Sequence, residues 1–223
     1  MTETERRRVY DAESSREMLL NAAEETFACE GFDGARIDAI AAASGYNKSL
    51  IFHYFEDKMG LYIAVIRRLK EHSEDLQSSL LTPVLESEEI LQDGRKFRAF
   101  LEEIIGASFD FLQAYPNFLR ILSWEAAEQW KTFSQIVTRL DLPMTKRLQQ
   151  FFLQAQKNGI LRSDIDPVMI IVLTLSMCQS YLTSLPRYEI VLEQNLSSPE
   201  ALARAREQIV RFVVHGMMAD PCE

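Results

Sequence analysis

The stretch RIDAIAAASGYNKSLIFHYFEDK, from Arg36 to Lys58, predicts two short helices joined by a tight turn. The turn contains Gly45, where a left-handed backbone can end the first helix at little cost to a glycine. Asn47 is the predicted N-cap of the second helix, because its side-chain oxygen can accept a hydrogen bond from an unpaired N–H. Two helices joined by a short turn that contains glycine are typical of a DNA-binding helix-turn-helix.

The apolar pattern on both short helices agrees with this interpretation. In the first helix Ile37, Ile40 and Ala41 recur at helical spacing, so we expect them to face inward. In the second helix Ile51 and Phe55 share one face. The other faces remain available for contact with a partner.

A helix is predicted on each side of this pair. Residues 14–17 have the Ser-x-x-Glu spacing of a capping box and predict the start of the preceding helix, which Gly31 ends. Asp57 is the predicted N-cap of a longer following helix, which Pro83 stops.

The remainder of the chain also has a helical pattern, with almost no alternation of the kind that strands show. Pro143 falls inside one predicted helix and either kinks it or splits it in two. Asp166 and Pro167 predict an N-cap followed by proline at the first helical position. The expected helices cover residues 88–114, 117–128, 132–157, 166–184 and 199–218. We therefore expect an all-α chain, with a three-helix helix-turn-helix domain and its N-terminal arm in residues 1–58 and a larger helical domain in residues 59–223.

Composition indicates a folded protein with an acidic balance. Hydrophobic residues make up 47 %, and the formal net charge is −9. Even residues 1–58 hold 7 Lys and Arg against 12 Asp and Glu, so DNA binding depends on where the positive residues lie. Three widely spaced cysteines and a polar N-terminus favour a reduced, cytoplasmic chain. No apolar run approaches the ~20 residues of a membrane span, so no membrane partner is expected.

The sequence lacks the common signatures of catalysis and metal binding. It contains no glycine-rich phosphate loop, no HExxH, no GxSxG and no paired spacing of metal ligands. We expect no catalytic residue, no metal site and no cofactor. Two alternatives from other classes stay open, namely an all-α enzyme or metal-binding helical protein that does not act on DNA, and a purely structural or protein-interaction module.

The order of elements resembles the TetR family of transcriptional repressors. The resemblance is strongest over residues 15–62, including the stretches Gly31-Phe32 and His53-Tyr54-Phe55. It implies a transcriptional regulator, in the usual case a repressor. Such a protein binds a palindromic operator in double-stranded DNA as a homodimer, and a small-molecule effector releases it.

The resemblance also implies a set of DNA contacts. Lys48, Ser49 and Leu50 match the positions that read base edges, and lysine suits guanine while leucine suits a thymine methyl. The chain departs from the family at Phe52, where tyrosine is usual, and at Arg36, which follows an alanine where the family has a Ser or Thr cap. The predicted contacts are Arg36, Lys48, Ser49, Leu50, Phe52, His53, Tyr54 and Lys58.

A small hydrophobic or amphipathic effector is expected in the larger domain, because aromatic residues gather there and apolar cavities are the usual form of a ligand site. Glu125 could orient a ligand if it faces inward, or belong to a solvated face. His72 is either a sensor or a boundary histidine. The predicted effector contacts are His72, Phe100, Ile104, Phe111, Ile121, Trp124, Glu125, Trp130, Met177 and Tyr181.

The last two long helices, near residues 166–184 and 199–218, carry wide apolar faces. Internal packing would account for these faces. A two-fold four-helix bundle between two copies of the chain is the alternative, and it is the homodimer interface that we expect.

Overall fold

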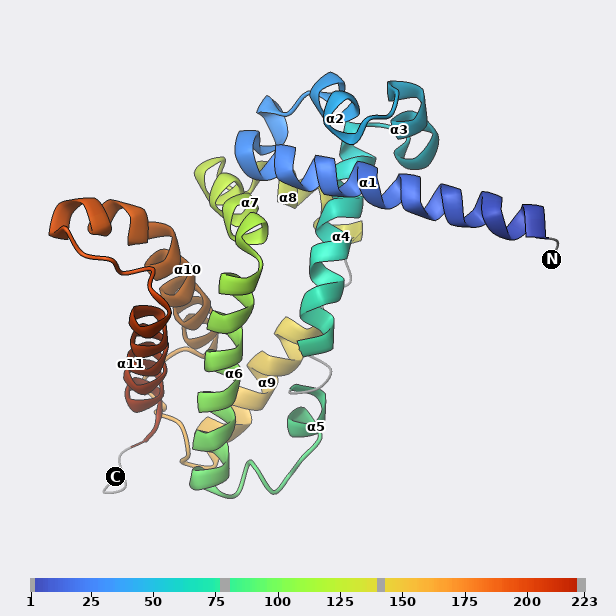
Figure 1. Ribbon diagram of the computed structural model, residues 1–223. Helices are drawn as coiled ribbons and strands as arrows, with labels where there is room; N and C mark the ends of the chain where they lie inside the picture. Colours follow the sequence, from blue (N-terminus) through green and yellow to red (C-terminus); the bar gives the residue numbers. More distant parts are fainter. Residues whose placement is uncertain (1–2, 77–80, 140–142, 220–223) are drawn as a thin grey trace. The chain divides into compact units, whose positions relative to one another are not determined.

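The computed structural model describes residues 3–76, 81–139 and 143–219, and Figure 1 shows their arrangement. The described residues form helices and no strand, with one isolated β-bridge between Leu161 and Met218. The predicted all-α class is therefore confirmed.

Figure 1 labels the helices in chain order. They are α1 Glu3–Gly34, α2 Ile37–Ser44, α3 Lys48–Phe55, α4 Lys58–Leu76, α5 Thr82–Leu85, α6 Gly94–Ala114, α7 Pro116–Ala127, α8 Lys131–Ile136, the 3-10 helix η2 Val137–Arg139, α9 Pro143–Lys157, α10 Pro167–Leu192 and α11 Pro199–Met217.

Two predicted helix boundaries near the N-terminal half are wrong. Helix α1 begins at Glu3, so the capping-box residues 14–17 lie inside it. Gly31, by contrast, ends the helical run as predicted, because its backbone is not helical (φ 69°, ψ 179°) and divides the span Glu3–Gly34 there. Pro83 lies in the first turn of the short helix α5, rather than ending the long helix before it. The four residues 77–80 lie outside the described part of the chain.

Local capping explains two further boundaries. The helix predicted from residue 88 begins at Gly94 instead, because the Asp93 side chain accepts a hydrogen bond from the Arg95 N–H at 2.8 Å and caps α6. The helix predicted over 132–157 is split, and its second part, α9, begins at Pro143. Proline at a first helical position needs no N–H partner, which accounts for the split.

Helix α10 begins as predicted, with the Asp166 carboxylate accepting from the Val168 N–H at 2.6 Å. It continues beyond residue 184 to Leu192, with Pro186 inside it. By length and average composition alone α10 could cross a membrane, although Thr174 and Ser176 interrupt its apolar run as the sequence predicts. A core helix of a folded protein can pass the same test of length and composition.

The chain forms two compact units, and each unit is made of two segments that are separate in the sequence. Unit 1 comprises residues 1–72 with 117–140, and unit 2 comprises 73–116 with 141–223. In unit 1 the core of α1 to α4 also includes Ile121 and Ile136, from α7 and the end of α8. The predicted boundary after residue 58 separates a DNA-binding domain from a second domain, which is a functional division. It remains a prediction.

Unit 2 is built around α6, which packs against both α10 and α11. The guanidinium of Arg206 on α11 donates to Asp110 at 2.7 Å and passes over Gly106, where an added Cβ would lie 2.4 Å from the Arg206 Nη2. Four buried rings from α6 and α9 form an aromatic cluster. They are Phe97, Phe100, Phe151 and Phe152.

Candidate nucleic-acid interface

The turn between α2 and α3 has the predicted geometry. Gly45 takes φ 76° at the end of α2. The Asn47 Oδ1 accepts a hydrogen bond from the Leu50 N–H at 2.9 Å, which caps α3. The buried Ser44 hydroxyl donates to the Ala41 carbonyl at 3.0 Å and so fixes the last turn of α2. Both capping predictions are confirmed.

Helix α3 buries one face and exposes the other. Ile51 and Phe55 are buried in the core of unit 1, as their spacing predicts. Lys48, Ser49 and His53 are exposed on the remaining surface. The helix therefore presents an exposed face with polar side chains, of the kind that enters a major groove in helix-turn-helix proteins.

Phe52 is the exception on that face, because 47 % of this apolar residue is exposed. Leu50, in the first turn of the same helix, is half-buried. The phenyl ring of Phe52 has no group that can donate a hydrogen bond to a phosphate, but it can contact a thymine methyl. The chain thus has an apolar contact surface where the resemblance implies a tyrosine hydroxyl.

Lys48 is held by an ion pair with Asp38 on α2. Both side chains are more than half exposed, at 51 % and 68 %. An exposed pair of this kind contributes little to stability, so the lysine can exchange its partner when DNA approaches.

The two other cations of the predicted interface lie at helix ends. Lys58 donates from Nζ to the Asp33 carbonyl at 3.2 Å and lies over the Phe32 ring, 4.7 Å from its centroid. Arg36 occupies the N-cap of α2 without making a side-chain cap. Tyr54 is partly buried, and its ring centroid lies 5.3 Å from that of His53.

The junction between α3 and α4 is tight. Glu56 takes φ 68° after α3, and the Asp57 Oδ1 then accepts from the Gly60 N–H at 2.7 Å. A Cβ added to Gly60 would lie 1.9 Å from the Phe55 carbonyl oxygen. Close backbone approach therefore accounts for the glycine at this position.

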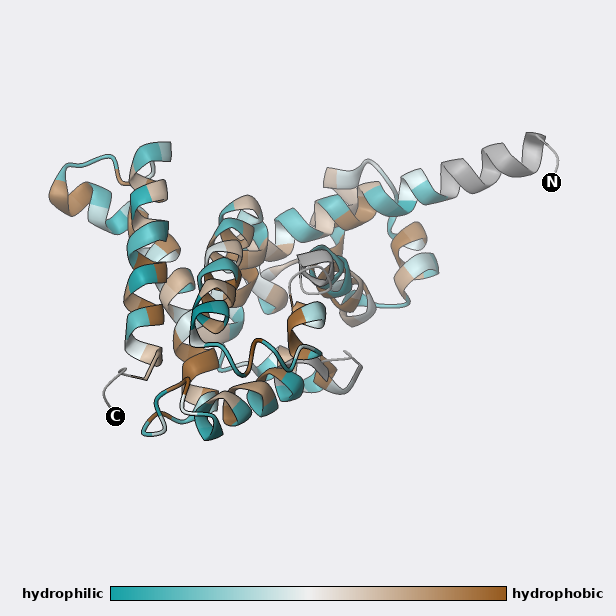
Figure 2. Cartoon of the chain, turned by 90° about the horizontal axis from the view of Figure 1, so that it is seen from below, coloured by the Kyte–Doolittle hydropathy of each residue, from teal (hydrophilic) through white to brown (hydrophobic). Residues whose placement is uncertain are grey.

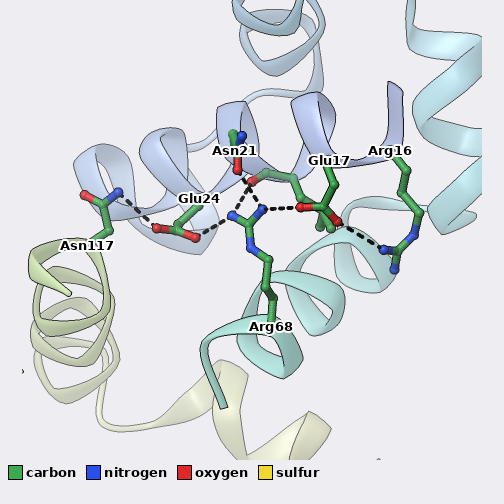
Figure 3. Close-up of polar contacts among 7 residues, drawn as sticks. Arg16, Glu17, Asn21, Glu24, Arg68 and Asn117 are labelled. Carbon is green, nitrogen blue, oxygen red and sulfur yellow. Dashed lines mark hydrogen bonds and ion pairs between the residues drawn. The ribbon is translucent and has the colours of Figure 1, made fainter. Parts of the chain in front are cut away.

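A polar network joins α1, α4 and α7 in unit 1 (Figure 3). The Arg68 guanidinium of α4 donates to Asn21 at 2.7 Å and to Glu24 at 2.5 Å, both on α1. The second oxygen of Glu24 accepts from the Asn117 amide of α7 at 3.1 Å. The side chains of Arg68 and Glu24 are only 15 % and 17 % exposed, so this ion pair is shielded from solvent.

Glu125 faces inward, but its carboxylate is fully engaged by its own unit. One oxygen accepts from the Tyr62 hydroxyl at 2.6 Å, and the other accepts from the Phe133 N–H at 3.0 Å. Burial and, to a lesser extent, the hydrogen bond to Glu125 raise the pKa of Tyr62 far above its usual range. The carboxylate thus links α4, α7 and α8.

The predicted effector contacts are divided between the two units. Unit 1 holds His72, Ile121, Trp124, Glu125 and Trp130, and unit 2 holds Phe100, Ile104, Phe111, Met177 and Tyr181. Phe100 and Ile121 are buried in the cores of their units. Met177 and Tyr181 line an apolar groove of about 550 Å³ along α10.

Within the described residues, no group of three or more His, Cys, Asp or Glu side chains is placed to hold a metal ion. Cys178 is buried, and burial raises the pKa of its thiol to about 11, so it is a protonated core residue at neutral pH.

The capped pair α2 and α3, with one face of α3 in the core and the other in solvent, defines a helix-turn-helix DNA-binding protein. Comparison with known proteins agrees. Residues 19–65 match the family described as "Bacterial regulatory proteins, tetR family". Residues 98–213 match "Tetracyclin repressor-like, C-terminal domain". The chain belongs to the TetR family of transcription regulators.

Individual relatives are more distant. The chain is 25 % identical to the HTH-type transcriptional repressor NicS of Pseudomonas putida, over 88 % of this chain and 89 % of the relative. It is 24 % identical to the HTH-type transcriptional regulator RutR of Escherichia coli, over 92 % and 91 %. Among solved structures it is similar in fold to the ketosteroid transcriptional regulator KstR2 of Mycobacterium tuberculosis. The TM-score is 0.64 at 18 % identity, and the match covers 92 % of this chain and 95 % of that structure.

Proposed function

We propose that this protein is a cytoplasmic homodimeric repressor that binds a palindromic operator and releases it when a small-molecule effector binds. The observation that carries the proposal is the exposed polar face of α3, held by the Asn47 cap and bearing Lys48, Ser49 and His53. The chain as a whole is negatively charged and would be repelled by the DNA phosphates. This face carries a lysine and no carboxylate, so it can approach the bases.

Within this face Lys48 is the proposed base-reading residue. Its ammonium group, released from Asp38, can bind guanine O6 and N7. Ser49, Leu50, Phe52 and His53 complete the surface toward the bases. Arg36, Tyr54 and Lys58 lie at or near the helix ends, and we assign them to phosphates.

The test is binding to short palindromic duplexes, selected from genomic fragments and measured as a function of salt. Lys48→Ala should lose about 1–3 kcal/mol of discrimination at one base position. Lys58→Ala should weaken all sequences alike and reduce the salt slope by about one. If Lys48→Ala weakened all sequences alike and Lys58→Ala changed the base preference, these assignments would be wrong. A purified protein that selects no fragment at all would contradict the proposed function.

Dimerisation is proposed through α10 and α11. The two helices together expose many large apolar side chains to solvent. A surface of this kind on a single copy usually marks a contact with another protein. On α10 the exposed side chains include Val172 and Leu173, and on α11 Phe212 is 70 % exposed. Figure 2 shows that the C-terminal end of α10, before the loop into α11, is strongly hydrophobic. Covering this surface with a second copy removes it from water.

The effector is proposed to be small and hydrophobic or amphipathic. The ten predicted contact residues remain part of this proposal. The buried Phe100 and Ile121 could reach a ligand only if their cores opened, and Glu125 only if its carboxylate left the Tyr62 hydroxyl or the Phe133 N–H. The groove beside Met177 and Tyr181 favours an apolar ligand portion, since it is lined mainly by apolar side chains.

A further inference from the structure

A second candidate ligand site lies within unit 1, between α1 and α7. It is a hollow of about 420 Å³. This volume is in the range of ordinary small-molecule sites. Its lining residues are Ala28, Cys29, Arg120, Ser123 and Trp124.

Trp124 is held rigidly beside this hollow. Its indole N–H donates to the Ala28 carbonyl at 3.2 Å. Its ring lies against Gly31, where an added Cβ would be 3.0 Å from the Trp124 Cδ2. Even so, 38 % of the residue is exposed. A fixed, partly exposed indole provides a flat apolar surface on which a planar group can stack.

Arg120 supplies an available positive charge at the same hollow. It is exposed, and no ion pair engages it within the described part of the chain, whereas Arg68, Arg147 and Arg206 each pair with a carboxylate. A guanidinium group can bind a carboxylate with two parallel hydrogen bonds. Because the Ser123 hydroxyl donates to the Leu119 carbonyl at 2.8 Å, Arg120 is the main donor available to an anion.

We propose that this hollow binds a small molecule in which a carboxylate is attached to a flat, largely apolar ring. The carboxylate would pair with Arg120, and the ring would lie on Trp124 beside the Cys29 thiol. The guanidinium supplies one bidentate anion contact, and the indole beside it favours an anion that carries a flat apolar ring.

The position of the hollow also suggests an effect on DNA binding. Its α1 wall, Ala28 and Cys29, lies immediately before the interruption at Gly31, and α1 packs directly against α2. A ligand seated in the hollow that alters the packing of α1 would therefore shift α2, and α3 with it, because α1 contacts α2 and α2 contacts α3. This step rests on the proposed function, whereas the binding of the carboxylate does not.

The experiment uses benzoate as the probe, with benzamide and cyclohexanecarboxylate for comparison. Calorimetry on the full-length protein should give saturable binding of benzoate, with weaker binding of the other two. Arg120→Gln should weaken benzoate binding by at least about tenfold and leave benzamide unchanged. Arg98→Gln, which removes an exposed arginine from α6, is the matched control and should change neither.

A second measurement needs no variant. Benzoate bound in the hollow should slow alkylation of Cys29, followed by mass spectrometry of its peptide. No saturable benzoate binding, unprotected Cys29, or equal losses in Arg120→Gln and Arg98→Gln would overturn the site. Binding that leaves operator affinity unchanged would overturn only the coupling to DNA. Failure of the protein to bind any operator would contradict the proposed function while the benzoate titration still reports on the hollow.

Discussion

Asn47 holds the first turn of α3 through one hydrogen bond, to the Leu50 N–H at 2.9 Å. Asn47→Ala should therefore destabilise the protein by about 1 kcal/mol, since the N–H is left without its cap. Urea denaturation measures this loss. Asn47→Asp is the matched control, because a carboxylate also caps a helix start and should preserve stability while weakening DNA binding by repulsion from phosphate. Equal destabilisation by both changes would show that the cap is not responsible.

Residues whose role depends on their neighbours in sequence could be predicted from sequence alone. Gly45, Asn47 and Asp166 act within three or four residues, and all three have the predicted role. The contacts of Arg68 and Glu125 could not be predicted in this way. Arg68 meets Glu24 across 44 positions and Glu125 meets Tyr62 across 63, so these partners follow only from the packing of α1, α4 and α7.

The junction of α3 and α4 requires a glycine. In Gly60→Ala the new Cβ would meet the Phe55 carbonyl oxygen at 1.9 Å, so the backbone of one helix must move. We expect a loss of about 1–3 kcal/mol in the free energy of unfolding, together with weaker operator binding.

The control for this change is Gly216→Ala on α11, where an added Cβ meets no atom within 4 Å. There the substitution should stabilise the protein by up to about 1 kcal/mol, because alanine is the better helix former. The two substitutions should therefore have opposite signs. The same sign at both positions would contradict the packing argument.

The network of Arg68 ties three helices together, so its loss should affect the unit as a whole. Arg68→Ala leaves the carboxylate of Glu24 shielded from solvent with only its Asn117 contact, and should cost about 2–3 kcal/mol. Arg211→Ala removes an arginine whose pair with Glu207 is exposed on α11, and should cost less than about 0.5 kcal/mol. Thermal denaturation of both variants measures the two losses in stability. Equal losses would show that the Arg68 network contributes no more than an exposed ion pair.

Helix boundaries were predictable where a strong local signal stood alone. The start of α10 at Pro167 follows from one aspartate and one proline. Its end does not, because the helix continues through Pro186 to Leu192 although the sequence suggested an end at residue 184. Proline disfavours the interior of a helix, yet α10 continues through Pro186. The residues next to Pro186 in the sequence do not reveal this continuation.

At the scale of the whole molecule, the proposed dimer gives a direct test. Val172 is 53 % exposed on α10, and Val172→Glu places a charge on the apolar face. We expect the dimer to weaken by at least about a hundredfold, because the interface would bury an unpaired carboxylate. Sedimentation measures the association, and operator affinity should fall with it.

Leu153→Glu is the matched control for the dimer, since Leu153 is 41 % exposed but lies on α9, outside the proposed interface. It should leave the association unchanged. A Val172→Glu protein that remains dimeric with native helix content would place the interface elsewhere.

The composition of unit 1 determines how this regulator can be recombined with others. A natural design for a chimaeric sensor would join residues 1–58 to the effector domain of a relative. That graft would separate α1 from Arg68, and the foreign helix in place of α7 would have to supply a counterpart for Asn117. A transplant that carries residues 1–72 together with 117–140 keeps every one of these contacts, so the exchangeable module is discontinuous in the gene.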